Sequence, residues 1–337
     1  MTDLPYHKSL RLENFTAFAD ASFEFVPGIN VFVGENGTGK THVMKAMYGA
    51  QLIGSGAGKE IYETLEDLFQ TRDIADLIRL GSKLGYSRAG GDFGGQQWSF
   101  AVSGGKERGI AESRLTRSVE RPVFIPAIDM MGHTKAFLAA ANLVVLDFDL
   151  TCTDLVALMG LQRRNGAQPA DLSELLASRL GGTLEYDEVD GRFYLVTPLG
   201  RMPMPMVAEG LRKVATLVRL LQMGWLSPGT TLFWDEPEVN INPKLMYDLI
   251  GVILALARRG VQVFLATHSY VILKELDLQA TGDDKIRFFN LHGRKLGTKV
   301  TWADTLSELE PNPILQHYGS LFDRDMRRAV KAERARG

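Results

Sequence analysis

The chain has 337 residues, of which 45% are hydrophobic and 23% are charged, so it has enough apolar material to bury a core and is predicted to be globular. Its formal net charge of −2 excludes a general attraction to nucleic acid or anionic membrane, so contact with a polyanion would need a local basic patch. A single cysteine, Cys152, excludes an intramolecular disulfide, and the chain has no secretory signal and no apolar run of about 20 residues, which predicts a cytoplasmic protein without a membrane contact.

The N-terminal segment is predicted to form three strands that lead into a glycine-rich loop. Apolar side chains alternate from Leu10 to Phe25, and the apolar run Ile29 to Val33 stands directly before the glycines. After Lys40 the apolar residues have helical spacing, and this helix is expected to end at Gly54. Strand, loop and helix in this order form the context in which phosphate-binding loops occur.

The loop GENGTGKT satisfies the pattern G-x-x-x-x-G-K-[ST]. Glycines allow successive backbone N–H groups to curl around phosphate oxygens at a helix N-terminus, where the helix dipole also favours the anion. Lys40 is expected to contact the β and γ phosphates of ATP, and the Thr41 hydroxyl to ligate Mg²⁺. An ordinary glycine turn is the alternative, which the flanking strand and helix disfavour. The predicted nucleotide-binding residues are Gly34, Asn36, Gly37, Thr38, Gly39, Lys40 and Thr41.

The middle of the chain, residues 59–205, is predicted to be an inserted lobe of helices and a β-hairpin. In TLEYDEVDGRFYLVT, the pair Asp190 and Gly191 separates two alternating runs, which is a hairpin signal. The other expected elements are two short helices within Glu60–Gly81, a loop over Gly85–Gly95, strands at Trp98–Val102 and Pro122–Ile128, and mostly helical sequence over Lys135–Leu180.

The last part of the chain alternates predicted strands and helices. Strands separated by helices of this length indicate an α/β fold with a mainly parallel sheet covered by helices on both faces. The expected elements are a helix from Glu209, a strand at Thr231–Trp234, a helix at Pro243–Arg259, a strand at Val261–Ala266, a helix at Tyr270–Glu275, strands at Ile286–Leu291 and Lys299–Trp302, and a charged terminal helix.

Two carboxylates, Asp235 and Glu236, directly follow the predicted strand Thr231–Trp234. Sheets of this class place their ligands at the carboxyl ends of the strands. Asp235 is therefore expected to orient Mg²⁺, and Glu236 to align the attacking water or to accept its proton. The alternative for either acid is a plain turn or a helix cap.

A histidine, His268, follows the next predicted strand and is expected at the same edge of the sheet. There it would hydrogen-bond the γ-phosphate or the attacking water, and Ser269 would cap the following helix. The alternative is a structural or surface histidine.

Taken in their order along the chain, the glycine-rich loop, the Asp–Glu pair and the histidine resemble the motifs of a known family. The opening LRLENFTAFADASFEFVPGINVFVGENGTGKT resembles the start of RecF-like and SMC-like ATPases of the ABC superfamily; WDEPEVNINPKL resembles their Walker B motif and D-loop, and ATHSYVILKEL their histidine switch. With RPVFIPAIDMMG and AEGLRKVATL, the chain is similar to the stand-alone bacterial AAA-type ATPases grouped with the overcoming-lysogenization-defect family.

The resemblance implies a single P-loop NTPase domain of ABC type over residues 1–337. An N-terminal antiparallel β portion and the P-loop would occupy residues 1–58, the inserted lobe residues 59–205, and the signature helix, Walker B motif, histidine switch and C-terminal helix residues 206–337. It also implies ATP, Mg²⁺ and a head-to-tail homodimer that encloses ATP.

Within this family the segment that starts at Ala208, Glu209 and Gly210 would be the signature helix, which caps the γ-phosphate bound by the second subunit. Alanine at position 208 replaces the usual serine, so backbone N–H groups, the helix dipole, and Arg212 or Lys213 would contact the phosphate instead. The alternative is a helix with basic residues on its solvated face. Gln96 and Gln97 are candidates for the Q-loop by residue type only.

The family's usual appendages are not found in this sequence, which carries neither a coiled-coil run nor a Toprim nuclease segment. Asp323 and Asp325 are expected to lie on a charged helix face, and the basic residues around them either are solvated or contact nucleic acid. The predicted function is an ATP-hydrolysing switch that regulates a separate effector, a nuclease or toxin of a bacterial anti-phage defence system. A RecF-like DNA-repair or DNA-clamp ATPase is the alternative, and a transporter subunit is disfavoured because no Q-loop is recognisable.

Overall fold

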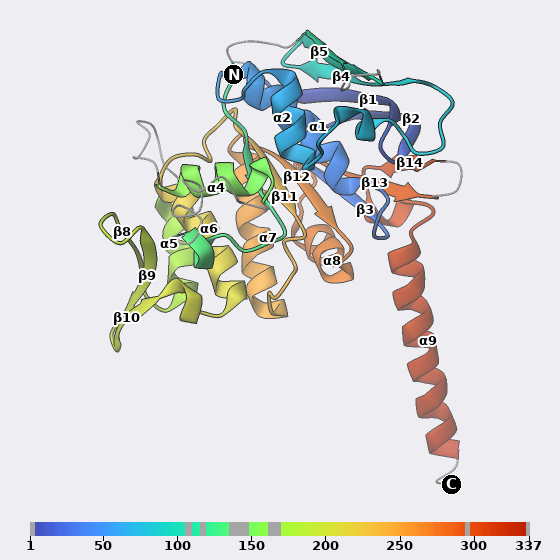
Figure 1. Ribbon diagram of the computed structural model, residues 1–337. Coiled ribbons are helices and arrows are strands. Elements are labelled where there is room, and N and C mark those ends of the chain that lie inside the picture. Colours follow the sequence, from blue (N-terminus) through green and yellow to red (C-terminus); the bar gives the residue numbers. More distant parts are fainter. Residues whose placement is uncertain are drawn as a thin grey trace.

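The computed structural model describes residues 4–104, 110–114, 119–134, 148–160, 170–293 and 297–334 (Figure 1). The strands are β1 His7–Phe15, β2 Phe18–Glu24, β3 Ile29–Gly34, β4 Tyr86–Phe93, β5 Gln96–Ser103, β6 Ile110–Arg114, β7 Val123–Ile125, β8 Thr183–Asp187, β9 Arg192–Thr197, β10 Gly200–Pro203, β11 Thr231–Asp235, β12 Gln262–Thr267, β13 Ile286–His292 and β14 Lys299–Ala303. The helices are α1 Lys40–Gly54, α2 Ile61–Phe69, α4 Leu150–Gly160, α5 Ala170–Leu180, α6 Glu209–Gln222, α7 Pro243–Arg258, α8 Tyr270–Gln279 and α9 Pro313–Arg334, with short 3-10 helices η1 Ile74–Leu77, η2 Met131–His133, η3 Met204–Met206 and η4 Leu306–Glu308.

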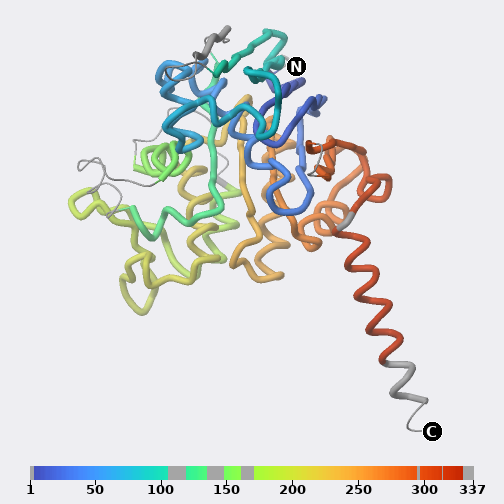
Figure 2. The backbone as a smooth tube through the Cα atoms, turned by 45° about the vertical axis from the view of Figure 1, so that its right-hand side comes forward, coloured from blue at the N-terminus to red at the C-terminus, as the bar shows by residue number. Residues whose placement is uncertain are grey.

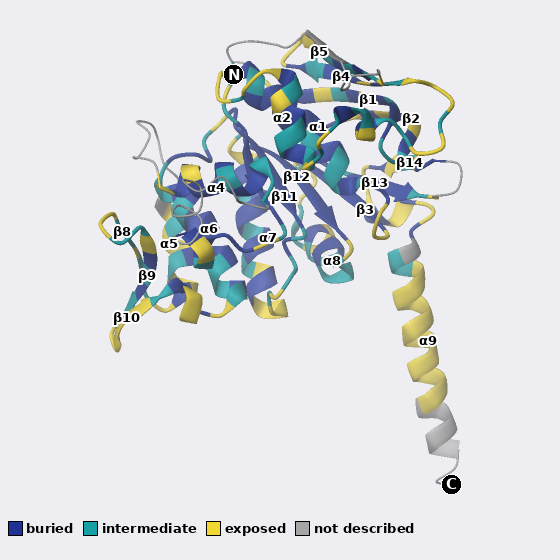
Figure 3. Cartoon of the chain, viewed as in Figure 1, coloured by how far each residue is buried: buried dark blue, intermediate teal, exposed yellow. Residues whose placement is uncertain are grey.

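The central sheet has the strand order β14-β13-β3-β12-β11-β7 and is parallel except for β14, which pairs antiparallel with β13. Every residue of β3, β11 and β12 is buried, as expected for parallel strands covered on both faces (Figure 3). Because these three strands are neighbours and run the same way, the segments that follow them start from one edge of the sheet. The predicted α/β fold class is therefore confirmed.

Two hydrophobic cores lie on opposite faces of this sheet. One contains phenylalanines from β3, β11, β12 and β13 together with α1, α2 and the antiparallel sheet β2-β1-β4-β5-β6. The other contains the apolar residues of α4 to α8 packed against the same strands. The phosphate-binding loop is thus held between two packed layers, which fixes its position relative to the ends of β11 and β12.

The glycine-rich stretch Gly85–Gly95, expected to be a loop, is instead mostly strand β4. This strand lies between β1 and β5, and a Cβ at Gly91 would stand 2.2 Å from the carbonyl oxygen of Ser9. Gly94 and Gly95 form the turn to β5 with φ of 59° and 86°, the conformation that two-residue hairpin loops require. The prediction was wrong because glycines that permit close strand approach look, in sequence, like glycines of a loop.

Substituting Gly91 by alanine is expected to destabilise the protein by about 1–3 kcal/mol, because the added methyl group collides with the backbone of β1. Urea unfolding measures the change in the free energy of unfolding. Gly85→Ala is the matched control, since a Cβ there meets no atom within 4 Å and the effect should stay below about 1 kcal/mol. Equal unfolding midpoints for the two variants would contradict this reading of β4.

The predicted hairpin around Asp190 and Gly191 is confirmed as β8 and β9, and Gly191 has a positive φ of 65°. Two strands were not predicted: β6, and β10, which is the third strand of the sheet formed with β8 and β9. Of the expected helical stretch Lys135–Leu180, α4 and α5 are present, while residues 135–147 and 161–169 lie outside the described residues. The strands and helices predicted after Glu209 are present at the predicted places.

The C-terminal helix α9 extends away from the body of the molecule (Figure 2). Its described side chains from Gln316 to Arg328 are all exposed, and the Tyr318 ring stacks on Tyr270 of α8 at 4.5 Å between centroids. Asp323 and Asp325 lie on this exposed helix, whereas the side chains of the basic residues after Arg328 lie outside the described ones. No helix among the residues that the structure describes is long and apolar enough to cross a bilayer.

Candidate functional site

The segment between β3 and α1 has the geometry of a phosphate-binding loop. Gly37 and Gly39 adopt the left-handed region with φ of 78° and 92°, and a Cβ at Gly39 would stand 2.7 Å from the ring of Phe18. The Thr38 hydroxyl donates to the Glu35 carbonyl at 2.8 Å and closes the loop. The N-terminus of α1 therefore faces a cavity of about 230 Å³. Its lining residues are Ala17, Asn36, Gly37, Gly39, Lys40, Thr41, His42 and Glu236.

Lys40 begins α1 and is 6% exposed. Its Nζ donates to the carbonyl oxygens of Gly34 at 2.8 Å and Glu35 at 3.1 Å, so the ammonium group lies within the curve of the loop. A phosphate held by the loop would come within reach of this ammonium group, the contact that a P-loop lysine makes.

Thr41 and Asp235 bring an alcohol and a carboxylate together beside the loop. The Thr41 Oγ1 donates to Asp235 Oδ2 at 2.7 Å. Burial raises the pKa of Asp235 to about 6, although the Thr41 hydrogen bond opposes the shift. Both are oxygen ligands, and a buried carboxylate gains most from a nearby cation, so this pair fits Mg²⁺.

Glu236 follows β11 and holds an unusual backbone conformation with φ of 45°. Its N–H donates to the Ala266 carbonyl of β12 at 2.9 Å, and its carbonyl accepts from Lys213 Nζ at 3.2 Å and from the Val239 N–H at 3.3 Å. A non-glycine residue in this region costs energy and persists where surrounding contacts over-determine it, as they do here. These contacts hold the Glu236 side chain on the lining of the cavity.

His268 lies at the end of β12, as predicted, and its Nδ1 is 3.4 Å from Glu236 Oε1 and 3.4 Å from Glu238 Oε1. Its side chain is 46% exposed, so it remains accessible to a bound ligand. Ser269 caps α8 by accepting from the Ile272 N–H, which confirms that expectation. The structure thus joins three segments distant in sequence at one edge of the sheet.

The candidate signature residues Ala208, Glu209 and Gly210 start α6 and do not line this cavity. A Cβ at Gly210 would stand 2.3 Å from the Asn240 carbonyl, so α6 packs closely on the turn after β11. Arg212 and Lys213 do not line this cavity either, and their expected contact with a phosphate bound by a second copy stays a prediction.

Both basic side chains are turned into their own chain. Arg212 Nε donates to Asp129 Oδ2 at 2.6 Å, and Lys213, 2% exposed, donates to Glu236. Gln96 and Gln97, the Q-loop candidates, lie in β5 of the antiparallel sheet and are absent from the lining of the cavity.

Three residues of the site were missed from sequence: Ala17, His42 and Glu238. Burial lowers the pKa of His42 to about 4, so it lines the cavity as a neutral ring. Lys213 was named from sequence as a phosphate contact, but its burial and its hydrogen bond to the Glu236 carbonyl were not predicted. Glu238 stands two residues after Glu236, a spacing that gives no hint of its contacts.

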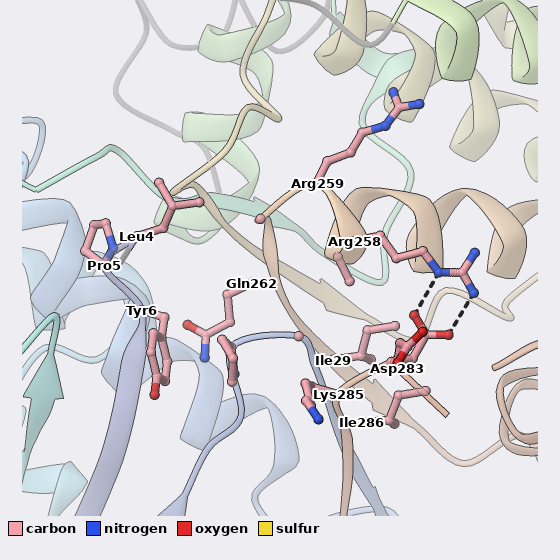
Figure 4. Close-up of a pocket in the computed structure, with 15 residues that line it drawn as sticks. Leu4, Pro5, Tyr6, Ile29, Arg258, Arg259, Gln262, Asp283, Lys285 and Ile286 are labelled. Atoms are coloured by element: carbon pink, nitrogen blue, oxygen red, sulfur yellow. Dashed lines mark hydrogen bonds and ion pairs between the residues drawn. The ribbon is translucent and has the colours of Figure 1, made fainter. Parts of the chain in front are cut away.

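A larger cavity, about 660 Å³, lies at the opposite edge of the central sheet, beside the amino ends of β3, β12 and β13 (Figure 4). Arg258 and Asp284 there bind each other through two hydrogen bonds of 2.8 and 2.7 Å, and Gln262 is bonded to the backbone of His7 and Val26. Arg258, Asp284 and Gln262 are therefore already paired within the chain, and ligands of α/β sheets bind at the other edge.

Two family models match parts of this chain. Residues 175–274 match the family described as "AAA domain, putative AbiEii toxin, Type IV TA system", and residues 9–66 match a family described as "AAA domain". The first match contains Asp235, Glu236 and His268, and the second contains the loop 34–41.

The similarity to curated proteins is short. The DNA replication and repair protein RecF of Pediococcus pentosaceus is 49% identical over 43 residues, which is 13% of this chain and 12% of that protein. RecF of Clostridium perfringens is 44% identical over 43 residues, again 13% of this chain and 12% of that protein. The chain thus spans about an eighth of the length of these relatives.

The similarity to solved structures covers most of the chain. The SMC head bound to the C-winged helix domain of ScpA has a TM-score of 0.60 at 14% identity and covers 90% of this chain and 98% of that one. The Pyrococcus furiosus SMC head with an extended coiled coil, bound to the C-terminal domain of ScpA, has a TM-score of 0.58 at 13% identity and covers 96% and 100%. At these identities the shared property is the fold.

Proposed function

We propose that this chain, which matches two AAA-domain families and RecF over part of its length and shares the fold of SMC heads, is an ABC-type P-loop ATPase. In this proposal it hydrolyses ATP and works as a switch that two copies form head to tail around the nucleotide. The observation that carries the proposal is the convergence of the loop 34–41, the Thr41–Asp235 pair, Glu236 and His268 at one edge of the sheet. This set supplies phosphate binding, metal binding and activation of water, the three requirements of phosphoryl transfer.

The chemistry follows from the position of each group. Backbone N–H groups of the loop and Lys40 bind the phosphates and so place the γ-phosphate at the N-terminus of α1. Thr41 and Asp235 would hold Mg²⁺, which would supply charge stabilisation to the phosphates. Glu236 aligns the attacking water and takes its proton, and His268 hydrogen-bonds the water or the γ-phosphate.

The small size of the cavity in a single copy supports the proposal that a second copy completes the site. Its volume of about 230 Å³ is below the roughly 300–1,000 Å³ usual for ligand pockets. Among the residues that the structure describes, its lining comes only from Ala17, the loop, the start of α1 and Glu236. The start of α6 offers backbone N–H groups and a helix dipole. In a head-to-tail pair, Ala208, Glu209 and Gly210 of one copy would complete the site of the other.

The proposed biological role is control of a separate effector, a nuclease or toxin of a bacterial anti-phage defence system. The match to a family described by a putative toxin of a type IV toxin–antitoxin system supports this context. A RecF-like role in DNA repair or as a DNA clamp is the second candidate, supported by the 43-residue matches to RecF.

Glu236→Gln with ATP and Mg²⁺ is expected to form a stable dimer, because the variant binds ATP without consuming it. Light scattering should give twice the chain mass of 37.3 kDa, and Lys40→Ala, which loses the phosphate contact, should stay at the mass of one chain. A single-chain mass for Glu236→Gln at saturating ATP would refute the dimer. Co-purification of the dimer from its host then separates the two roles: a stoichiometric nuclease or toxin supports the effector, and DNA alone supports the clamp.

A further inference from the structure

Glu238 lies in the turn after β11 and joins that turn to the end of β12. Its Oε1 accepts hydrogen bonds from Thr267 Oγ1 at 2.7 Å and from the His268 backbone N–H at 3.0 Å. Thr267 Oγ1 in turn accepts from the Ser269 N–H at 2.9 Å. One carboxylate therefore fixes three consecutive residues, of which the last caps α8.

Glu238 Oε1 also lies 3.4 Å from the Nδ1 atom of the His268 ring. Glu236 Oε1 lies 3.4 Å from the same nitrogen. Two carboxylates beside Nδ1 favour the ring form that carries its proton there, since a carboxylate accepts and cannot donate. The remaining nitrogen, Nε2, is then an acceptor in the neutral ring and a donor in the protonated ring.

The other oxygen of Glu238, Oε2, is buried without a hydrogen-bond partner in the described part of the chain. Lys213 of α6 donates its hydrogen bond to the Glu236 carbonyl and not to this oxygen. An isolated buried carboxylate oxygen is costly and is expected where its charge has a use. The charge of this carboxylate acts on the His268 ring, 3.4 Å from Oε1, as well as on Lys213.

We propose that Glu238 is a positioning residue for the histidine: it holds the 267–269 segment in place and keeps a proton on Nδ1 of His268, so that Glu236 and His268 act on the γ-phosphate in a fixed arrangement. This inference rests on the proposed function for its kinetic consequence. Its structural consequence, the state of the ring, stands apart from hydrolysis.

The charge and the hydrogen-bond acceptor are separable by substitution. Glu238→Gln keeps a carbonyl oxygen for Thr267 and for the His268 N–H but removes the charge, whereas Glu238→Ala removes both. The control is Glu185→Gln, an exposed acid of the β8–β9 hairpin that is paired with Arg201. Circular dichroism and thermal melting establish that each variant is folded.

Steady-state kinetics test the action through the histidine. Glu238→Gln is expected to lower kcat by about 10-fold with little change in KM, a coupling typical of groups in contact. In a His268→Ala background, the same change should lower kcat less than about 2-fold, because the group it acts through is gone. An equal loss of kcat with and without His268, or no loss in either case, would overturn the proposal. The control Glu185→Gln should have the kcat of the unaltered protein.

Nitrogen-15 NMR of the imidazole rings tests the ring state without turnover, with His268→Ala identifying the resonances. The unaltered protein should carry the His268 proton on Nδ1, and Glu238→Gln should move population to the Nε2-protonated form. An unchanged distribution sinks the inference even if ATP is hydrolysed. Failure of the unaltered protein to hydrolyse ATP removes the proposed function and leaves this measurement valid.

Discussion

Glu236→Gln is expected to lower kcat for ATP by about 10²–10³-fold while ATP binding stays close to that of the unaltered protein. The amide keeps the size of the side chain and cannot accept the proton of the attacking water. The backbone of Glu236 is held by Ala266, Lys213 and Val239 rather than by its side chain, so the turn should keep its shape in the variant. Phosphate release under single-turnover conditions measures the chemical step directly.

Titration with a fluorescent ATP analogue separates binding from chemistry in the same variant. Glu185→Gln controls for the loss of one negative charge elsewhere on the surface. If Glu236→Gln hydrolyses ATP at a rate within a few-fold of the unaltered protein, Glu236 does not activate the water. Glu238, the other carboxylate beside His268, would then be the residue to test next.

The parts of the site that could be predicted from sequence are those whose chemistry is local. Gly34 to Thr41 are consecutive, and their backbone conformation depends on glycines that the sequence displays directly. Asp235, Glu236 and His268 could be predicted because each ends an apolar run that reads as a buried strand.

The other features depend on packing between distant segments, which periodicity does not encode. Glu238 acquires its role only because β11 and β12 are neighbours, which brings Thr267 to its carboxylate. The Lys213 side chain points into the protein, where its ammonium group donates to the Glu236 carbonyl, although a lysine side chain on a helix is usually exposed to solvent. The glycines of β4 were mistaken for a loop for the same reason.

The strand order also explains why the three motifs meet. In sequence, β3 precedes β11 and β12 by about two hundred residues, yet β3 lies between β12 and β13 in the sheet. The end of β12 therefore stands between the phosphate-binding loop and the two acids. His268 there contacts Glu236 and Glu238, a neighbourhood that the order of motifs along the chain does not reveal.

Asp235→Asn is expected to have two opposite effects: loss of Mg²⁺-dependent hydrolysis by about 100-fold or more, and greater stability of the metal-free protein at neutral pH. The first effect follows from the loss of an anionic ligand opposite Thr41. The second follows from burial, which raises the pKa of Asp235 from 3.8 to about 6. A carboxyl group with a raised pKa binds its proton more tightly in the folded state, so its ionisation opposes folding.

The upward direction of the Asp235 pKa shift determines the pH range in which the free energy of unfolding changes. In EDTA, the unaltered protein should lose free energy of unfolding as pH rises from about 4 to about 6, and Asp235→Asn should not show this loss. Near pH 7.5 the variant should be more stable by about 1–3 kcal/mol, whereas near pH 4 the two proteins should differ little from this group. Urea unfolding across this pH range gives both values.

Addition of Mg²⁺ should narrow or reverse the difference in free energy of unfolding between the two proteins near pH 7.5. An ion that binds the folded state stabilises it, and only the unaltered protein retains the carboxylate that binds the ion. Thr41→Ala is the matched control: it should weaken Mg²⁺ binding while leaving the Asp235 charge, and so it should not gain stability in EDTA. If Asp235→Asn is less stable than the unaltered protein in EDTA at every pH, the neighbouring groups stabilise the ionised Asp235 carboxylate rather than destabilise it. The cation would then not be what stabilises its charge, and Asp235 would be a structural residue of the loop instead of a metal ligand.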